Sequence, residues 1–431
     1  CVALASALGN ALGTTSWCGL DNKVKLRSAT LFKGLWDSRG KNASRTTTYV
    51  APAGGTFVVT ATTLGDTKVA LDTKTIIDTR GLAEFSVPRT DQVTLRKGTR
   101  YRFTLTWQGA PPSVTITDAQ PEVAAAVHAA SGAKVAVVLA YDLAREGMDR
   151  STLQLPGAQS AVISAIAQHM PTVVLLATDG AVSMPWLAKA GAVLEGWDPT
   201  GAVNTDRTLS QYAGAWRNLL DGTADPSGRL PETFPASTTD SPLGNASFWP
   251  GIGTNVDLNL PPDHGIGIGM PWYRSAGWPV LFPFGYGLSY ADFSLQGGSV
   301  ANVGGALQVS VTVQDSNGLP GVEVVQLYAD FPSSLGEPRQ QLVAFGTVRF
   351  TKTSLATSST KTATLTVTPD ALTVYEGATM RVEKGSYCLQ ASTYAGDPKS
   401  WTTGPDALGA TPNGQVITGG AATLSPGSCP S

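Results

Sequence analysis

The chain has 431 residues, of which 14% are charged, and its formal net charge is −2. A chain of this length holds about two to four domains, each with its own core. Nucleic acids and anionic membranes bind basic surfaces, so the balanced charge argues against both partners. No apolar run reaches the roughly 18 residues that a membrane-spanning helix needs.

The first part of the sequence is expected to be a β-module. Residues 1–45 hold a short apolar segment and an irregular stretch, and they are the expected end of a preceding domain half. Within residues 46–118, apolar and polar residues alternate over 56–61, 68–72 and 101–107, with turn residues between these runs. Alternation with period two at short spacing predicts an all-β structure.

Residues 119–296 have a different pattern. A continuous apolar run at 135–140 is typical of a strand that is covered on both faces. Strands and helices then alternate, at residues 157–169 (helix), 172–177 (strand), 192–197 (strand) and 209–220 (helix). This order predicts a parallel sheet with crossover helices, which is an α/β domain.

The last part of the sequence returns to strands. Several short runs with β-pattern occur in residues 297–395, at 307–313, 323–328, 363–367 and 386–391. Such spacing predicts a β-sandwich. Residues 396–431 are expected to form a C-terminal tail. The predicted fold class is therefore multidomain, with α/β and all-β parts.

Four cysteines lie near the two ends of the sequence: Cys1, Cys18, Cys388 and Cys429. An even number in two groups predicts two local disulfides, Cys1–Cys18 and Cys388–Cys429, and four reduced, buried thiols are the alternative. Disulfides persist in oxidising compartments. We therefore expect an extracellular, secreted protein.

Charged residues gather in the loop that follows the strand at 135–140. Loops at the carboxyl ends of parallel strands form the ligand crevice of an open sheet. There a partly desolvated Glu146 would have a raised pKa and could donate a proton near neutrality. Gly147 lets the backbone turn beside it, and an Asp149–Arg150 couple would support the loop through charge-assisted bonds. A solvated charged loop without a function is the alternative.

Other kinds of chemistry find no support in the sequence. None of the three histidines lies near a cysteine or a second histidine, so no metal site is expected. No glycine-rich phosphate loop follows the first α/β strand, and no nucleophile elbow occurs, which argues against phosphoryl transfer and serine hydrolysis. We expect no cofactor.

Five motifs in the same order resemble glycoside hydrolase family 3. Glu146-Gly147-x-Asp149-Arg150, followed by Leu155-Pro156-Gly157, is similar to the acid/base loop of that family. The other four are Met184-Pro185-Trp186-Leu187, Asp225 to Pro231 with Thr233-Phe234-Pro235, Leu281-Phe282-Pro283-Phe284-Gly285-Tyr286-Gly287-Leu288-Ser289-Tyr290, and Glu323 to Tyr328. After Trp197 the sequence departs from the family pattern, because Asp198-Pro199 stands where Tyr-Pro is usual.

The resemblance implies the C-terminal half of a β-glucosidase. Residues 119–296 would be part of its α/β sandwich domain, and residues 297–395 its fibronectin-III-like domain. Residues 46–118 resemble the PA14 module that rims the substrate pocket in some members, through Gly55-Thr56-Phe57 and Ile76-Ile77-Asp78. A purely structural β-module is the alternative.

The resemblance also implies roles for single residues. Glu146 would be the general acid/base of a retaining glycosidase, while the nucleophile is an Asp of an N-terminal barrel that this sequence lacks. Trp186, Trp272 and Tyr273 would stack on sugar or line the pocket, with core packing as the alternative. The substrate would be a carbohydrate or a glucosylated small molecule.

The implied partner is the N-terminal barrel polypeptide, which is either cleaved from this chain or missing from a fragment. The sequence begins at a cysteine without an initiating methionine or a signal peptide, so we expect a processed product or a part of a longer protein. A β-xylosidase or another exo-acting specificity stays open, as does a homo-oligomer. The rival function is a non-catalytic carbohydrate-binding or adhesion protein, which would have no need of a general acid.

Overall fold

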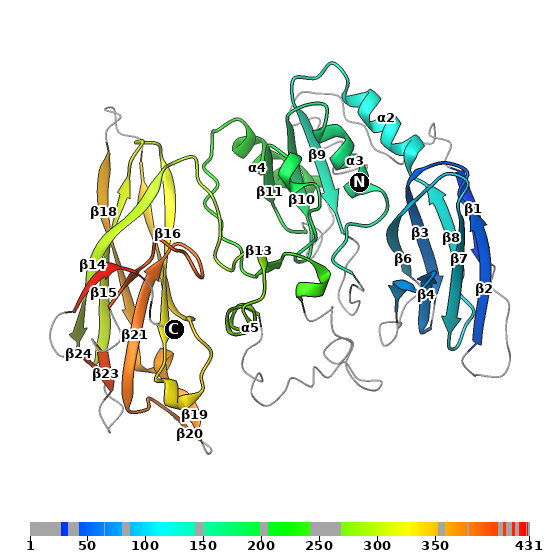
Figure 1. Cartoon of the computed structure of the whole chain (residues 1–431). Helices are drawn as coiled ribbons and strands as arrows, with labels where there is room; N and C mark the ends of the chain where they lie inside the picture. The colour runs from blue at the N-terminus through cyan, green and yellow to red at the C-terminus, as the bar shows by residue number, and fades with distance from the viewer. Residues whose placement is uncertain are drawn as a thin grey trace. The chain divides into compact units, whose positions relative to one another are not determined.

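The computed structural model describes residues 27–32, 43–63, 65–79, 87–142, 150, 152–198, 206–241, 269–351, 358–376, 379–403, 408–410, 416–418, 422–427 and 429. The chain divides into two compact units (Figure 1). Unit 1 is Cys1–Arg217 with Ser237–Asn259, and unit 2 is Asn218–Ala236 with Leu260–Ser431. No helix in these described ranges is long and apolar enough to cross a membrane.

The N-terminal part of unit 1 is a β-module of two four-stranded antiparallel sheets. One sheet has the order β1 (Arg27–Phe32), β8 (Ser113–Asp118), β3 (Gly55–Thr63) and β6 (Val87–Leu95). The other has the order β2 (Ala43–Val50), β7 (Arg100–Trp107), β4 (Thr67–Leu71) and β5 (Lys74–Asp78). The predicted all-β structure is confirmed, but it begins before residue 46, since β1 and part of β2 lie within the expected N-terminal segment.

Strand β3 is covered on both faces. Phe57, Val59 and Ala61 alternate toward the core of the β-module, where none of them is exposed. Val58 points the other way and belongs to a second core with helices α2 (Gln120–Ala130) and α3 (Gln159–Ala167). Successive side chains of a strand face opposite sides. The β-module therefore shares hydrophobic packing with the α/β part of unit 1.

The α/β part holds a three-stranded parallel sheet, in the order β11 (Ala192–Glu195), β10 (Thr172–Ala177) and β9 (Ala136–Tyr141). Leu176 pairs with Ala140 on one side and with Glu195 on the other, so the three strands end together. Helix α3 lies between β9 and β10 in sequence, and α4 (Asp206–Leu220) follows β11. The predicted parallel sheet is confirmed, and α3 is the crossover helix between β9 and β10, whereas only a short 3-10 helix, Leu187–Lys189, lies between β10 and β11.

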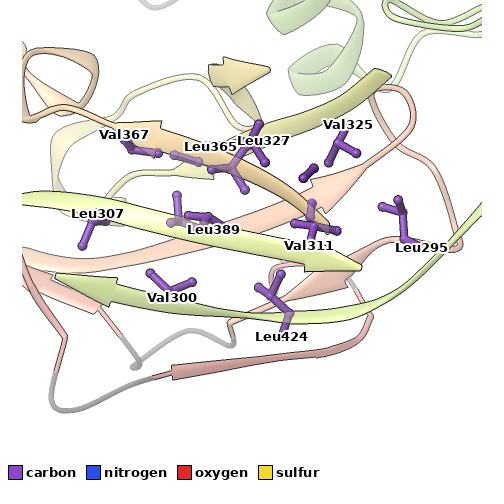
Figure 2. Close-up of a cluster of buried hydrophobic side chains, with 14 of the residues drawn as sticks. Leu295, Val300, Leu307, Val311, Val325, Leu327, Leu365, Val367, Leu389 and Leu424 are labelled. Carbon is purple, nitrogen blue, oxygen red and sulfur yellow. The ribbon is translucent and has the colours of Figure 1, made fainter. Parts of the chain in front are cut away.

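Unit 2 contains a β-sandwich. Its strands follow one path, β17 (Gln341–Phe350), β16 (Gly321–Asp330), β21 (Gly385–Ser392), β22 (Trp401–Thr402), β25 (Ala422–Pro426), β14 (Phe293–Val303), β15 (Ala306–Asp315) and β18 (Ser359–Val367). Figure 2 shows the core between the strands, where Val311, Leu327, Leu365 and Leu389 point toward one another. Before the sandwich come β12 (Phe234–Pro235), helix α5 (Met270–Ala276) and β13 (Val280–Phe282), and β12 pairs with β13.

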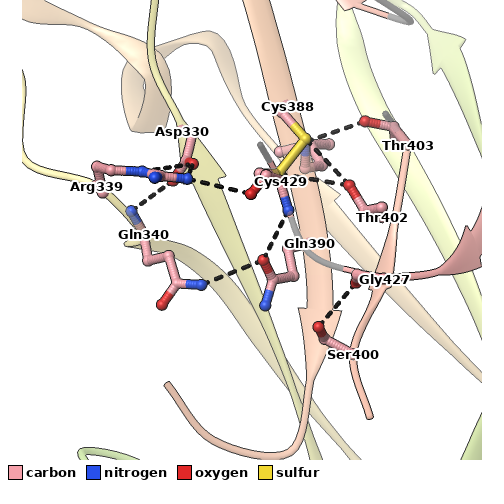
Figure 3. The surroundings of a disulfide bond; sticks show 11 residues. Asp330, Arg339, Gln340, Cys388, Gln390, Ser400, Thr402, Thr403, Gly427 and Cys429 are labelled. Atoms are coloured by element: carbon pink, nitrogen blue, oxygen red, sulfur yellow. Dashed lines mark hydrogen bonds and ion pairs between the residues drawn. A yellow bond between two sulfur atoms is a disulfide. The ribbon is translucent and has the colours of Figure 1, made fainter. Parts of the chain in front are cut away.

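Residues expected to form a tail belong to the sandwich. β25 pairs with β14 and with β22, and β23 (Leu408–Ala410) pairs with β21 and with β24 (Val416–Thr418). These strands are too short for an alternation pattern, and their pairing is set by distant partners. Cys388 and Cys429 form the predicted disulfide, with 5.9 Å between their Cα atoms (Figure 3). Cys1 and Cys18 lie outside the described residues.

Candidate active site

The carboxyl ends of the three parallel strands carry acidic side chains. Asp142 follows β9, Asp179 comes two residues after β10, and Glu195 is the last residue of β11. The backbone N–H of Asp179 donates to both carboxylate oxygens of Asp142, at 3.2 and 3.3 Å. Ligands of open parallel sheets bind outside the carboxyl ends of the strands, so this edge is the candidate active site.

Asp142 and Arg150 form an ion pair at the base of the loop that follows β9. Nη1 of Arg150 lies 2.9 Å from Oδ2 of Asp142, and only 4% of the Asp142 side chain is exposed. Nη2 of Arg150 also donates to the carbonyl of Ala181, at 3.0 Å. Glu146 and Asp149 lie between these two ends, outside the described residues. The loop is thus closed by a charge-assisted contact, and Arg150 has Asp142 as its partner.

Helix α3 fixes the start of the same loop. Oε1 of Gln159 accepts the backbone N–H of Tyr141 at 2.9 Å, and its Nε2 donates to the carbonyl of Tyr141 at 2.9 Å. The same Nε2 donates to the carbonyl of Pro156, at 3.0 Å. These bonds would be lost if the end of β9 moved, and lost bonds at a part-buried site are costly. The segments on both sides of Glu146 are therefore held in place.

Glu195 connects the ends of β10 and β11. Its Oε1 accepts the backbone N–H of Trp197 at 2.7 Å, and its Oε2 accepts the hydroxyl of Thr178 at 3.0 Å. Burial raises the pKa of Glu195 to about 7, although these hydrogen bonds act in the opposite direction and the charge of Asp142 adds to the rise. Near neutrality this carboxyl group is therefore neutral in a large fraction of molecules.

The two aspartates at this edge are also harder to ionise than usual. Burial raises the pKa of Asp142, which Arg150 and the N–H of Asp179 partly offset, while Asp198 adds to the rise. Burial raises the pKa of Asp179 too, and the negative charges of Asp142 and Asp198 act in the same direction. Several carboxyl groups at this edge thus have raised pKa values. Such an environment suits a reaction in which a carboxylic acid donates its proton.

The three aromatic residues proposed for the pocket lie in different surroundings. Trp186 has no exposed surface, and its indole Nε1 has no hydrogen-bond partner among the described residues. Trp272 is 6% exposed. Both indoles are therefore packed in the interior, which agrees with the core-packing alternative, since a tryptophan in a motif gives no sign of which way it points. Neither lines the hollow in which Tyr273 is found.

Tyr273 lines a hollow of about 220 Å³ in unit 2. The wall includes two more aromatic residues, Trp278 and Phe284, together with Arg274. The N–H of Trp278 donates to the carbonyl of Tyr273 at 3.1 Å, which holds this wall at the end of α5. Tyr273 is thus the one of the three that lines this hollow.

Two of the motifs that carried the family resemblance meet in a buried ion pair. Nη2 of Arg229 lies 3.0 Å from each carboxylate oxygen of Glu323, and their side chains are 8% and 5% exposed. Asp225 accepts the hydroxyl of Ser289 at 2.7 Å and the N–H of Tyr290 at 2.8 Å. The motif at Asp225 to Pro231 therefore has a structural task, which is to join the sandwich to the segment before it.

The most distinctive motif, residues 281–290, is tied to the sandwich in the same way. Gln326 donates through Nε2 to the carbonyl of Gly285 at 3.0 Å and to that of Thr393 at 2.6 Å. Gly285 has a φ of 81°, and a Cβ there would lie 2.0 Å from the Gln326 amide oxygen. Only glycine meets both demands. This motif therefore attaches the segment before the sandwich to the sandwich itself.

Sequence reasoning missed Asp179 and Glu195 as members of the strand-end group. A signal was available, since each stands at or just after the end of a predicted parallel strand, as Asp142 does. The described ranges contain no group of three or more His, Cys, Asp or Glu side chains that could hold a metal ion.

Acidic side chains at the carboxyl end of a parallel sheet, followed in the chain by a β-sandwich, define a multidomain protein with α/β and all-β parts. Residues 15–290 match the glycosyl hydrolase family 3 C-terminal domain, and residues 323–394 match the fibronectin type III-like domain. The chain therefore belongs to glycosyl hydrolase family 3.

Known proteins agree with this membership. A β-glucosidase of Rhizobium radiobacter is 30% identical over 392 residues, which are 83% of this chain and 45% of that enzyme. An exo-α-(1→6)-L-arabinopyranosidase of Bifidobacterium breve is 30% identical over 58% of this chain and 31% of its own length. Among solved structures, DesR, a β-glucosidase from Streptomyces venezuelae in complex with D-glucose, is 30% identical in sequence to this chain. The two structures superpose with a TM-score of 0.59 over 86% of this chain and 47% of DesR. The matches thus cover between 31% and 47% of the length of these relatives, so the chain spans half of their length or less.

Proposed function

We propose that this chain is part of a retaining, exo-acting β-glucosidase and that Glu146 is its general acid/base. The nucleophile is an Asp of an N-terminal barrel polypeptide outside this chain, which agrees with relatives about twice as long. The observation that carries the proposal is the ion pair between Asp142 and Arg150, because these two residues flank Glu146 in the sequence and meet at the carboxyl edge of the sheet.

The chemistry follows two steps. In the first, the barrel carboxylate attacks the anomeric carbon, the bond to the leaving oxygen breaks, and the proton of Glu146 passes to that oxygen. In the second, the Glu146 carboxylate takes a proton from water, the water oxygen attacks the anomeric carbon, and the barrel carboxylate leaves. A neutral Glu146 at the start is consistent with an edge where burial already raises the pKa of Asp142 and Asp179.

The substrate class is a terminal β-glucosyl residue on an oligosaccharide or a small molecule. The similarity to β-glucosidases of two organisms supports a glucosyl group as the sugar that is released. The arabinopyranosidase relative makes a pentopyranosyl group the alternative to test. A non-catalytic carbohydrate-binding or adhesion protein remains the rival, and it would bind sugars without turnover.

The β-module in unit 1 is proposed to be a PA14-like insert at the rim of the substrate pocket. Its β6 contacts the segment that follows the acid/base loop, because the N–H of Gly157 donates to the Thr90 hydroxyl at 3.1 Å. A change in the module would then reach the loop through this contact. We also propose secretion, which the Cys388–Cys429 disulfide supports, since such bonds persist in oxidising compartments.

The deciding experiment is Glu146→Gln in the chain together with its barrel polypeptide. With aryl β-glucosides that have poor leaving groups, we expect a loss of about 10²–10⁴-fold in kcat/KM, whereas good leaving groups lose much less in the glycosylation step. Azide should restore the deglycosylation step of the variant. Glu337→Gln, in unit 2, is the matched control, since its carboxylate only accepts the side-chain amide of Gln341 among the bonds described here. Unchanged activity of Glu146→Gln would remove this residue from the mechanism.

The need for a second polypeptide is tested by native mass spectrometry of the purified particle. The expected mass is well above 44.6 kDa, the mass of this chain. A folded, monomeric species of 44.6 kDa that still hydrolyses aryl glycosides would contradict the proposal.

A further inference from the structure

The turn after β11 is tightly constrained. The N–H of Gly196 donates to the carbonyl of Leu176 at 2.9 Å, and a Cβ on Gly196 would lie 2.5 Å from the hydroxyl of Tyr212 and 2.7 Å from the indole nitrogen of Trp216. Trp197 follows in the left-handed region, with a φ of 60°. A large non-glycine residue in this region is rare, and the surrounding structure must hold it there.

Two contacts hold Trp197 from opposite sides. The hydroxyl of Tyr212, on α4, donates to the carbonyl of Trp197. The carboxyl of Glu195 accepts the N–H of Trp197 at 2.7 Å, while its other oxygen accepts the hydroxyl of Thr178, beyond β10. Glu195 thus links the strained turn to the neighbouring strand end. Without Glu195, the backbone N–H of Trp197 would lose the hydrogen bond that the carboxyl group accepts.

The turn stands close to the base of the loop with Glu146. Asp142, which closes that loop with Arg150, contributes to the raised pKa of Glu195, and Asp198, next to Trp197, contributes to that of Asp142. Such influence weakens with the separation of the groups. The charged and titratable groups that face Glu195 and its turn are therefore Asp142, Asp198 and Tyr212, with Asp179 beside Asp198 and Arg150 as the counter-charge.

We propose that Glu195 is a positioning residue, whose carboxyl fixes the Trp197 turn as a wall of the substrate site. This inference rests on the proposed function, since the site it serves is that of Glu146. Trp197 is half-buried and follows the end of β11 at this edge. A neutral carboxyl can keep both contacts, because its carbonyl oxygen accepts the Trp197 N–H and its hydroxyl group can pair with the hydroxyl of Thr178.

A fixed wall affects substrate binding more than bond breaking. Glu195→Ala should therefore raise KM for an aryl β-glucoside about tenfold and change kcat by less than about threefold. Glu195→Gln keeps an acceptor oxygen for the Trp197 N–H and should stay within about twofold of the unchanged enzyme. Thr178→Ala removes one of the two hydrogen bonds of Glu195, so its KM should lie between those of Glu195→Gln and Glu195→Ala. This variant also tests the proposal if Glu195→Ala does not fold. Glu337→Gln is again the control.

A second readout does not depend on catalysis. In ¹⁵N-labelled chain, the backbone amide signal of Trp197 should shift with a midpoint near pH 7, the pKa to which burial raises Glu195. This shift should disappear in Glu195→Gln, and the signal should move or broaden in Glu195→Ala. If the amide signal of Glu195→Ala overlays that of the unchanged chain, the positioning role is excluded, whatever the activity. Equal losses in kcat and kcat/KM, at unchanged KM, would overturn it as well.

The two proposals can fail separately. If the complete protein hydrolyses no glycoside but the Trp197 signal responds as described, the proposed function fails and Glu195 still fixes the turn. If Glu146→Gln abolishes turnover of poor leaving groups while Glu195→Ala leaves KM and the Trp197 signal unchanged, the proposed function stands and the role of Glu195 fails.

Discussion

Arg150 and Asp142 lie at opposite ends of one loop and form an ion pair of 2.9 Å, while Glu146 stands between them in the sequence. The side chain of Asp142 is almost completely buried, and burial raises its pKa although Arg150 opposes this effect. The guanidinium therefore has two tasks, since it stabilises a buried charge and sets the base of the loop.

Replacing Arg150 by Ala should separate these tasks. A carboxylate that loses its partner at a largely buried site destabilises the protein, here by about 2–4 kcal/mol because Arg150 is partly exposed. The measurement is urea unfolding of the chain. The double variant Asp142→Asn, Arg150→Ala should regain most of the free energy of unfolding, yet kcat/KM of the complete enzyme should stay about tenfold or more below normal. Full activity of the double variant would show that the ion pair does not set the loop.

The stability of the β-module should depend on Asp91. This residue lies on β6, and burial raises its pKa to about 6, with Lys74 and hydrogen bonds from Gln92 and Gln154 acting against the rise. Because the folded pKa lies above the ordinary value of 3.8, the folded state binds the proton more tightly, and stability falls as pH rises from about 4 to about 6. Asp91→Asn should therefore be more stable than the unchanged chain above pH 6, by about 1–2 kcal/mol, and nearly equal to it below pH 4. Thermal unfolding across this range checks the sign, and a variant that is less stable at pH 7 would contradict it.

The disulfide Cys388–Cys429 should contribute measurably to the sandwich. It joins residues 41 apart in sequence, and a loop of this size predicts about 2–4 kcal/mol of stabilisation. Its neighbourhood is polar, with the Cys429 carbonyl accepting from Arg339 at 3.1 Å (Figure 3). Cys388→Ser with Cys429→Ser should lower the urea midpoint by the same amount as a reductant does in the unchanged chain. A further effect of reductant on the double variant would point to another disulfide, and Cys1–Cys18 is the predicted one.

Removing one partner of the buried ion pair between Arg229 and Glu323 should destabilise the protein strongly, whereas replacing both partners by apolar residues should destabilise it little. Burial raises the pKa of Glu323, while Arg229 acts in the opposite direction. Glu323→Leu alone leaves the guanidinium without its partner and should destabilise unit 2 by about 3–5 kcal/mol. Arg229→Met with Glu323→Leu should recover most of this loss, since an apolar pair needs no charge partner. A double variant that is no more stable than Glu323→Leu would show that the pair is needed for the junction as well.

Long patterned segments were predictable from the sequence, because their local periodicity and their tertiary environment agree. The strand at residues 172–177 and helix α3 are examples, and each is covered by apolar neighbours as its pattern requires. Short strands such as β1 and β25 were not found, since their pairing depends on partners far away in the chain. Local pattern carries no information about such partners.

The candidate site was predictable only in part. The loop with Glu146 is predicted from its place after a parallel strand, but the contact of Arg150 with Asp142 is not, because the two residues stand at opposite ends of that loop in the sequence. The burial of Trp186 and the contacts of Glu195 could not be predicted from the sequence either. Both depend on how side chains from different strands and helices meet.

The position of β25 between β14 and β22 has a consequence for synthesis. Strand β14 leaves the ribosome more than a hundred residues before β25, so its edge stays open until nearly the whole sandwich has been translated. Contacts so distant in sequence make folding slow and leave an unpaired edge exposed to other nascent chains. Proteolytic trimming that removes β25 would recreate this open edge in the mature protein, which makes the segment from residue 422 onward a sensitive point for clipping and for the placement of fusion tags.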